Sequence, residues 1–278
     1  MNNTCDILIK NGNAIIPFSG IVNTNILIED GKIKALKKTI KNVSANKIIN
    51  AENKYILPGI IDPHVHYGVY TPINSAAITE STSAATGGVT TIMRMIRLDG
   101  TYKKIANHLQ VSKDTHITDY AVHASILEPN QVNDMSYLKR IGINSFKIYM
   151  NLGSDLKKIL VDLDPGYTSL KEIEVDMTDK LLTEIIRKGS ALSSIILVHA
   201  EDHAQCSKNI QEMRKLHEHV CSDLLKLWSS LRPESSEIYS IRKIMKIASN
   251  FEPNLYFVHI GSAAVSYTHL TLPTIYSV

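Results

Sequence analysis

YILPGIIDPHVH, residues 55–66, is the stretch that decides how the rest of the chain is interpreted. Its apolar run, interrupted by Pro58 and Gly59, is typical of a buried strand in a parallel sheet. The stretch ends in His64 and His66, and this i, i+2 spacing places both imidazoles on one side of a strand. Two neutral imidazoles aimed at one point suit zinc or a similar transition metal. The alternative is that one histidine belongs to the core and the other to the surface.

Before this stretch, residues 1–55 consist of short apolar runs separated by turn signals. Asn11-Gly12 and Asp30-Gly31 lie between such runs, and both dipeptides are typical of β-hairpins. We therefore expect a small antiparallel module, which alone has too little core and needs a partner from elsewhere in the full protein. The expected strands cover residues 6–10, 14–16, 25–28 and 32–36.

After this stretch, predicted strands alternate with predicted helices. The strands cover residues 89–93, 119–126, 145–150, 195–199 and 255–259, and the helices cover residues 75–86, 102–110, 135–141, 178–188 and 234–250. Repeated βα units indicate a parallel sheet, either doubly wound or closed into a TIM barrel.

The strand ends distinguish the two architectures. Polar residues that could share one site end four of the strands: His64 and His66, Lys147, His199, and His259. In an open sheet, a site forms where the strand order reverses and therefore uses few strand ends. In a barrel, the carboxyl ends of many strands surround one centre. We therefore predict a (β/α)8 TIM barrel over residues 56–265, with about six of its strands present.

Lys147 is unusual because it ends a buried strand, where an ammonium group is costly. Burial favours the neutral amine, which can add carbon dioxide to give a carbamate. The two carbamate oxygens can bridge two metal ions. Two further histidines, His123 and His203, are interpreted as structural.

The composition excludes several classes of protein. The chain has 278 residues, of which 44% are hydrophobic and 21% charged, as in ordinary globular proteins. A net charge of +3 without a basic tract argues against nucleic acid, and no apolar run reaches membrane-spanning length. Cys5, Cys206 and Cys221 lack disulfide or metal spacing, and the N-terminus lacks a signal segment, so we expect free thiols and a cytoplasmic protein.

An ordered set of motifs resembles the amidohydrolase superfamily, specifically the cyclic-amidase branch of dihydropyrimidinases, hydantoinases, dihydroorotases and allantoinases. The resemblance extends from Asp6 to about Gly261. The motifs are PGIIDPHVH, GGVTT, NSFKIYM, VHAE, RP and VH, at residues 58–66, 87–91, 144–150, 198–201, 232–233 and 258–259.

This resemblance implies hydrolysis of a cyclic amide by a hydroxide that bridges two divalent metal ions, with zinc expected. By resemblance, His64 and His66 hold the first ion, Lys147 bridges both as a carbamate, and His199 and His259 hold the second. An aspartate after the family's eighth strand acts as ligand and proton shuttle. The N-terminal strands form part of a β-sandwich that the C-terminal end of the family's chain completes. The expected partners are a small cyclic amide and further copies of the chain, as a dimer or tetramer.

Asp62 and Glu201 are candidates for orienting the ligand histidines, and their alternative roles are capping or a solvated loop. Arg97 falls where dihydroorotases carry an asparagine that helps bind the substrate carboxylate. We therefore predict an acidic ring substrate anchored by Arg97, with a surface ion pair as the alternative.

The sequence departs from the family pattern at two places. Gly68 replaces the arginine that dihydroorotases carry two positions after the second histidine, and Leu152 replaces the tyrosine that hydantoinases carry five positions after the lysine. Neither named activity therefore transfers directly. The segment 152–176 is longer than the family norm and is interpreted as a lid near the site or as a variable surface loop.

Two other functions remain open: a non-catalytic scaffold related to the superfamily, and a deaminase. A scaffold would have lost metal ligands, whereas every expected ligand position within this chain carries a ligand residue. The lysine on the fourth strand argues against a deaminase. Residues 266–278 resemble translated adapter sequence, so we expect a non-native tail and a C-terminally truncated chain, and His269 is not counted as a ligand.

Overall fold

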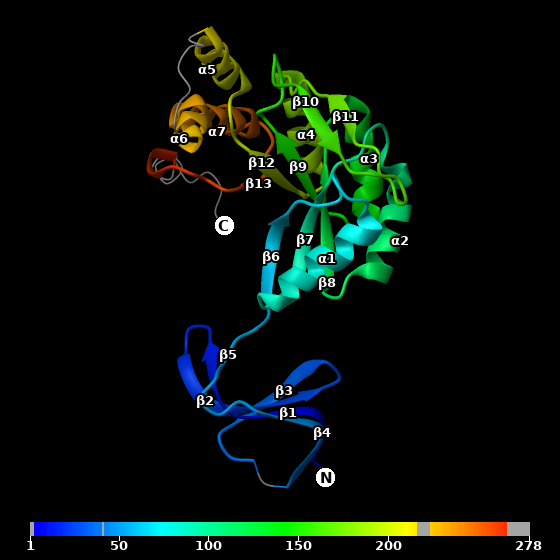
Figure 1. Cartoon of the computed structure of the whole chain (residues 1–278), viewed down its shortest axis with the longest axis vertical. Helices are drawn as coiled ribbons and strands as arrows, with labels where there is room; N and C mark the ends of the chain where they lie inside the picture. Colours follow the sequence, from blue (N-terminus) through cyan, green and yellow to red (C-terminus); the bar gives the residue numbers. More distant parts are fainter. Residues whose placement is uncertain (1–2, 41, 216–222, 266–278) are drawn as a thin grey trace. The chain divides into compact units, whose positions relative to one another are not determined.

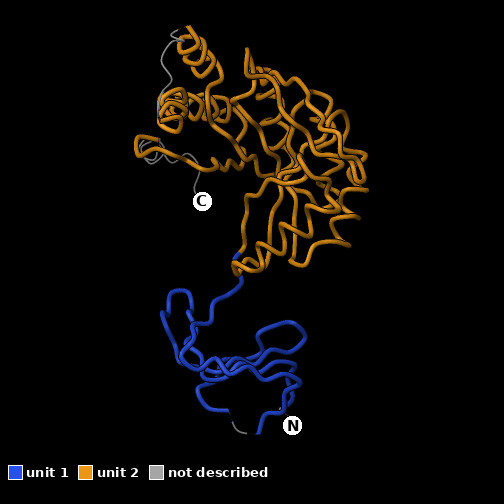
Figure 2. Tube along the Cα trace, viewed as in Figure 1, with its two compact units in different colours: residues 1–60 blue, residues 61–278 orange. Residues whose placement is uncertain are grey.

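The computed structural model describes residues 3–40, 42–215 and 223–265 (Figure 1). The chain divides into two compact units, residues 1–60 and residues 61–278 (Figure 2). The predicted tail and His269 lie outside the described residues. No helix in the described ranges is long and apolar enough to cross a membrane.

The first unit is one mixed sheet of five strands: β1 (Asn3–Ile16), β2 (Gly20–Glu29), β3 (Lys32–Lys37), β4 (Val43–Asn50) and β5 (Tyr55–Ile56). The hairpin predicted at Asp30-Gly31 is confirmed, because it joins antiparallel β2 and β3. The sheet is not purely antiparallel as expected, since β4 and β5 run parallel to β1.

The hairpin predicted at Asn11-Gly12 was wrong. Both residues lie inside β1, where the register with β2 shifts and Asn11 has φ of 61°. A Cβ atom at Gly12 would lie 2.1 Å from Cδ1 of Ile56, so this glycine permits close packing and not a turn. The reversal between β1 and β2 comes at residues 17–19 instead.

The second unit contains a six-stranded sheet whose spatial order follows the chain: β6 (Ile60–Val65), β7 (Val89–Ile96), β8 (Asp119–Ser125), β9 (Ser145–Tyr149), β12 (Ile195–His199) and β13 (Asn254–Phe257). The pairs from β7 to β13 are parallel. Consecutive strands that neighbour one another in order are typical of a barrel and not of a doubly wound sheet. The predicted partial barrel is confirmed, and β6 and β13 form its edges within the described part of the chain.

Helices follow the strands: α1 (Ile73–Thr86), α2 (Ile105–Thr115), α3 (Pro129–Arg140), α4 (Asp179–Ala191), α5 (His203–Lys215), α6 (Leu224–Leu231) and α7 (Glu234–Ala248), with a 3-10 turn η1 at Tyr102–Lys104. The sequence analysis missed α5 and α6 and placed the start of α3 too late. The signal for α3 was present, because Pro129 occupies its first turn and Glu128 and Gln131 form a capping box.

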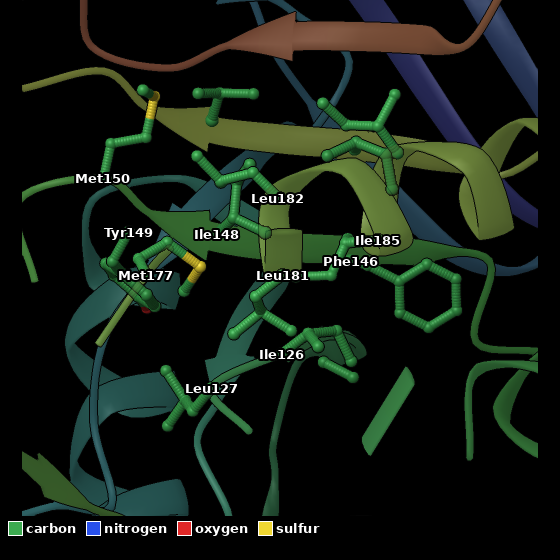
Figure 3. Packing of buried hydrophobic residues seen from close by; sticks show 14 of the residues in the cluster. Ile126, Leu127, Phe146, Ile148, Tyr149, Met150, Met177, Leu181, Leu182 and Ile185 are labelled. Atoms are coloured by element: carbon green, nitrogen blue, oxygen red, sulfur yellow. The ribbon is translucent and has the colours of Figure 1, made fainter. Parts of the chain in front are cut away.

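Alternation along β9 separates the core from the site. Phe146 and Ile148 are fully buried against Leu181 and Ile185 of α4 (Figure 3). The intervening Lys147 points to the opposite face of the strand, because successive side chains alternate. The apolar side of β9 therefore anchors the sheet to its helices, and the other side is left for chemistry.

Candidate metal centre and substrate pocket

The first histidine pair lies at the carboxyl end of β6. The Nε2 atoms of His64 and His66 are 3.1 Å apart. Asp62 accepts a hydrogen bond from the backbone N–H of His64 at 3.0 Å. The carboxylate of Asp62 thus holds the main chain that carries the pair.

The second pair joins the ends of β12 and β13. Nδ1 of His199 lies 3.0 Å from Nε2 of His259, which follows β13 by two residues and has φ of 40°. The rings of His64 and His259 are 5.5 Å apart between centroids, so the two pairs adjoin.

Lys147 lies on β9, one of the strands between those that carry the two pairs. Its side chain is fully buried, and Nζ has no hydrogen-bond partner among the described residues. Burial, with a smaller contribution from the positive charge of Arg97, lowers the pKa of Lys147 to about 7. A large share of this lysine is therefore neutral near pH 7, the form in which an amine adds carbon dioxide.

Both histidines of the first pair are also held neutral. Burial lowers the pKa of His64 to about 4, with help from Lys147. Burial also lowers the pKa of His66 to about 3, with help from Arg97. Neutral imidazole is the form that binds a metal ion.

These residues fit two metal ions. Two nitrogens bound to one ion at 2.0–2.1 Å in tetrahedral geometry would be about 3.3 Å apart, close to the separation in both pairs. No three His, Cys, Asp or Glu side chains within residues 3–40, 42–215 and 223–265 form a group that could hold an ion. Each pair therefore needs a ligand of another kind, and the unpartnered Lys147 could supply one oxygen to each as a carbamate.

The outer ring nitrogens of the two pairs face opposite charges. Nε2 of His199 donates to Oε2 of Glu201 at 3.3 Å, and the same oxygen accepts from Nη1 of Arg232. Arg232 lies over the ring of Trp228, with Cζ 4.4 Å from the ring centroid. On the other side, Nη2 of Arg97 donates to Nδ1 of His66 at 2.9 Å.

A cavity of about 500 Å³ opens beside the first pair, lined among others by His66, Tyr70, Glu80, Arg97, Lys158 and Glu172. Lys158 and Glu172 form an ion pair of 3.0 Å across its wall. Arg97 is held within the wall by donation from Nη1 to the carbonyl oxygen of Leu160 at 3.2 Å. A positively charged group thus lies beside the candidate metal centre, at the wall of a cavity large enough for a small ring.

The long segment 152–176 is fixed to the barrel. It forms a hairpin of β10 (Lys158–Val161) and β11 (Lys171–Glu174). Asp162 between them makes a buried ion pair with Arg94 of β7, and its backbone N–H donates to the carbonyl oxygen of Arg97 at 2.8 Å. This hairpin supplies a wall of the cavity, so the segment lies near the site, as one of the two interpretations predicted, and is not a loose surface loop.

The same contact explains one departure from the family pattern. Gly68 has φ of 98°, and a Cβ atom there would lie 2.6 Å from Nη2 of Arg94. No arginine fits at this position, because the guanidinium of Arg94 already occupies the space. Leu152 is buried in the main core, which accounts for the missing tyrosine.

His123 and His203 bond to groups outside the two pairs, in line with their structural interpretation. Both ring nitrogens of His123 have partners, Oγ of Ser145 at 2.6 Å and the carbonyl oxygen of Pro63 at 3.0 Å. His203 bonds to Oγ of Ser154 at 3.2 Å.

Sequence reasoning missed the ion pair of Arg94 and Asp162 and assigned no role to Arg232. An arginine inside an apolar strand, Met93-Arg94-Met95, was the available signal for the first. The Arg-Pro motif was the signal for the second.

Comparison with known proteins connects this geometry to a family. No family profile matches the chain. The D-hydantoinase of Rhizobium radiobacter is 29% identical over 205 residues, which cover 71% of this chain and 40% of that protein. The dihydroorotase of Methanosphaera stadtmanae is 25% identical over 244 residues, 86% of this chain and 50% of that protein.

The chain is thus similar in sequence to hydantoinases and dihydroorotases, which are cyclic amidohydrolases. The crystal structure of the L-hydantoinase from Arthrobacter aurescens supports the fold, with a TM-score of 0.78 over 95% of this chain and 55% of that one, at 22% identity. The chain spans about half the length of the curated proteins that it matches.

Proposed function

We propose that the protein hydrolyses the C–N bond of a cyclic amide, with two divalent metal ions held by His64, His66, His199, His259 and carbamylated Lys147. The observation that carries this proposal is the convergence of two facing histidine pairs on a buried, unpartnered lysine. A scaffold without catalysis would have no use for such a lysine, which costs stability when left unmodified.

The protein's own residues prepare the site before any metal binds. The neutral amine of Lys147 adds carbon dioxide and releases a proton, which leaves a carbamate anion with two oxygens. His64 and His66 stay neutral at physiological pH, because burial lowers the pKa of both. The bound ions would supply Lewis acidity and an activated water. Imidazole ligands suit zinc, which we propose as the metal.

The cavity beside His66 gives the substrate its place. We propose that a ring amide binds there with an acidic substituent, and that Arg97 grips this carboxylate because a guanidinium donates two parallel hydrogen bonds. The fixed hairpin of β10 and β11 would exclude water from one side of the ring.

The test is a substrate panel. The full-length protein is stripped of metal, reloaded with Zn²⁺ or Mn²⁺ in bicarbonate, and assayed against hydantoin, dihydrouracil, dihydroorotate and allantoin. We expect ring opening of at least one compound, only in the metal-loaded protein, with acidic rings favoured. Two results would contradict the proposal: stoichiometric metal binding without any ring opening, or equal activity in the metal-free protein.

A further inference from the structure

In His66 and His199, the hydrogen bond on the outer ring nitrogen decides which nitrogen is free for a metal ion. A guanidinium always donates, so Nδ1 of His66 must accept the bond from Arg97. A neutral imidazole that accepts at Nδ1 carries its proton on Nε2. That nitrogen is the one that faces His64 and would have to bind the ion.

His199 has the opposite arrangement. Glu201 can only accept, so Nε2 of His199 carries the proton and the lone pair of Nδ1 faces His259. Arg232, stacked on Trp228, fixes the carboxylate in place. A carboxylate behind a ligand histidine sets the ring for metal binding and strengthens it as a ligand.

We propose, on the basis of the function proposed above, that the two metal positions are unequal. The position between His199 and His259 takes the first ion tightly. The position between His64 and His66 takes an ion only when Arg97 leaves Nδ1 of His66.

A carboxylate in the cavity favours this departure, because Arg97 lines that cavity and gains a new partner there. The two binding events are linked. The carboxylate raises the affinity for the second ion, and the second ion raises the affinity for the carboxylate by the same factor. Arg232 is in this account a positioning residue, since it acts on His199 through Glu201.

The test is a Zn²⁺ titration of the metal-free full-length protein against a competing chelator, which needs no measurement of activity. We expect one tight and one weaker ion. Arg97→Met removes the competing donor and should strengthen the weaker ion at least tenfold. Glu201→Gln should weaken the tight ion about 10- to 100-fold. The matched controls are Arg242→Met and Glu212→Gln, which change exposed residues on α7 and α5.

Thermal unfolding of each variant first establishes that it folds. Acetate, a probe with one carboxylate, should strengthen the second ion in the unaltered protein and not in Arg97→Met. Two ions of equal affinity, or an Arg97→Met variant that binds the weaker ion no better, would overturn the inference while leaving the proposed metal centre intact. A folded protein that binds no Zn²⁺ would overturn both.

Discussion

The His64–His66 side and the His199–His259 side of the site are alike in spacing and unlike in support. The paired nitrogens are 3.1 Å apart on one side and 3.0 Å apart on the other. Behind the first pair lies the guanidinium of Arg97, which belongs to the wall of the neighbouring cavity. Behind the second lies the carboxylate of Glu201. The positive charge beside His64 and His66 favours a ligand that carries negative charge. The negative charge beside His199 favours a cation.

The largest effect should come from Lys147, which serves both sides. Lys147→Ala removes the only proposed ligand that is shared, so the full-length protein should lose most of its bound metal and nearly all activity. Small carboxylic acids should restore part of both, because they can occupy the place of the carbamate. Metal analysis after dialysis, with Lys103→Ala on the exposed surface of η1 as control, is the measurement. A variant with the metal content of the unaltered protein would contradict the bridging role.

The next effect concerns the buried ion pair that fixes the hairpin beside His64 and His66. Arg94→Met leaves the buried carboxylate of Asp162 without its partner and should lower the free energy of unfolding by about 3–5 kcal/mol. The double variant Arg94→Met, Asp162→Leu should recover much of this loss, because an apolar pair replaces a buried ion pair. Denaturation in urea measures both. Equal losses in the single and double variants would show that the ion pair is not what fixes the hairpin.

A smaller effect should separate acidic from neutral substrates. Arg97→Ala should raise KM for the best acidic ring about 10- to 100-fold at saturating metal, since a charge-assisted hydrogen bond is lost. A neutral ring should show little change in KM. Steady-state kinetics on both substrates, with Arg242→Ala as control, provides the comparison. An unchanged KM for the acidic ring would remove Arg97 as the anchor.

The smallest effect is the pH dependence of the metal-free protein. The pKa of Lys147 is about 7 in the folded chain against an ordinary value of 10.5, so the unfolded state binds more protons between these values and stability rises with pH. Between pH 7 and 9 this group should add roughly 2 kcal/mol to the free energy of unfolding. Lys147→Met should remove this increase, in buffer free of carbon dioxide. The same slope in both proteins would mean that the lysine is not buried as an amine.

The sequence predicted what strand periodicity can specify. Apolar runs predicted the strands of the large sheet, and the polar residues at the strand ends predicted the partial barrel that the structure confirms. Residue type and position at the strand ends also led to the histidines whose nitrogens the structure brings together in pairs.

Contacts between residues distant in the chain could not be read in this way. Asp162 and Arg94 are 68 positions apart, and no local pattern shows that their side chains meet. Gly12 has the appearance of a turn residue, and only the packing of Ile56 reveals that its missing side chain makes room. The same holds for the charges behind His66 and His199. The sequence does not show that Arg97 and Glu201 contact these rings, and only the structure places them there.

The most direct test of the two-metal site is anomalous X-ray scattering at the zinc edge from crystals of the zinc-loaded full-length protein. The account predicts two peaks, one between His64 and His66 and one between His199 and His259, with Lys147 extended by a carbamate that reaches both. Peaks elsewhere, or an unmodified Lys147 beside two occupied positions, would contradict it.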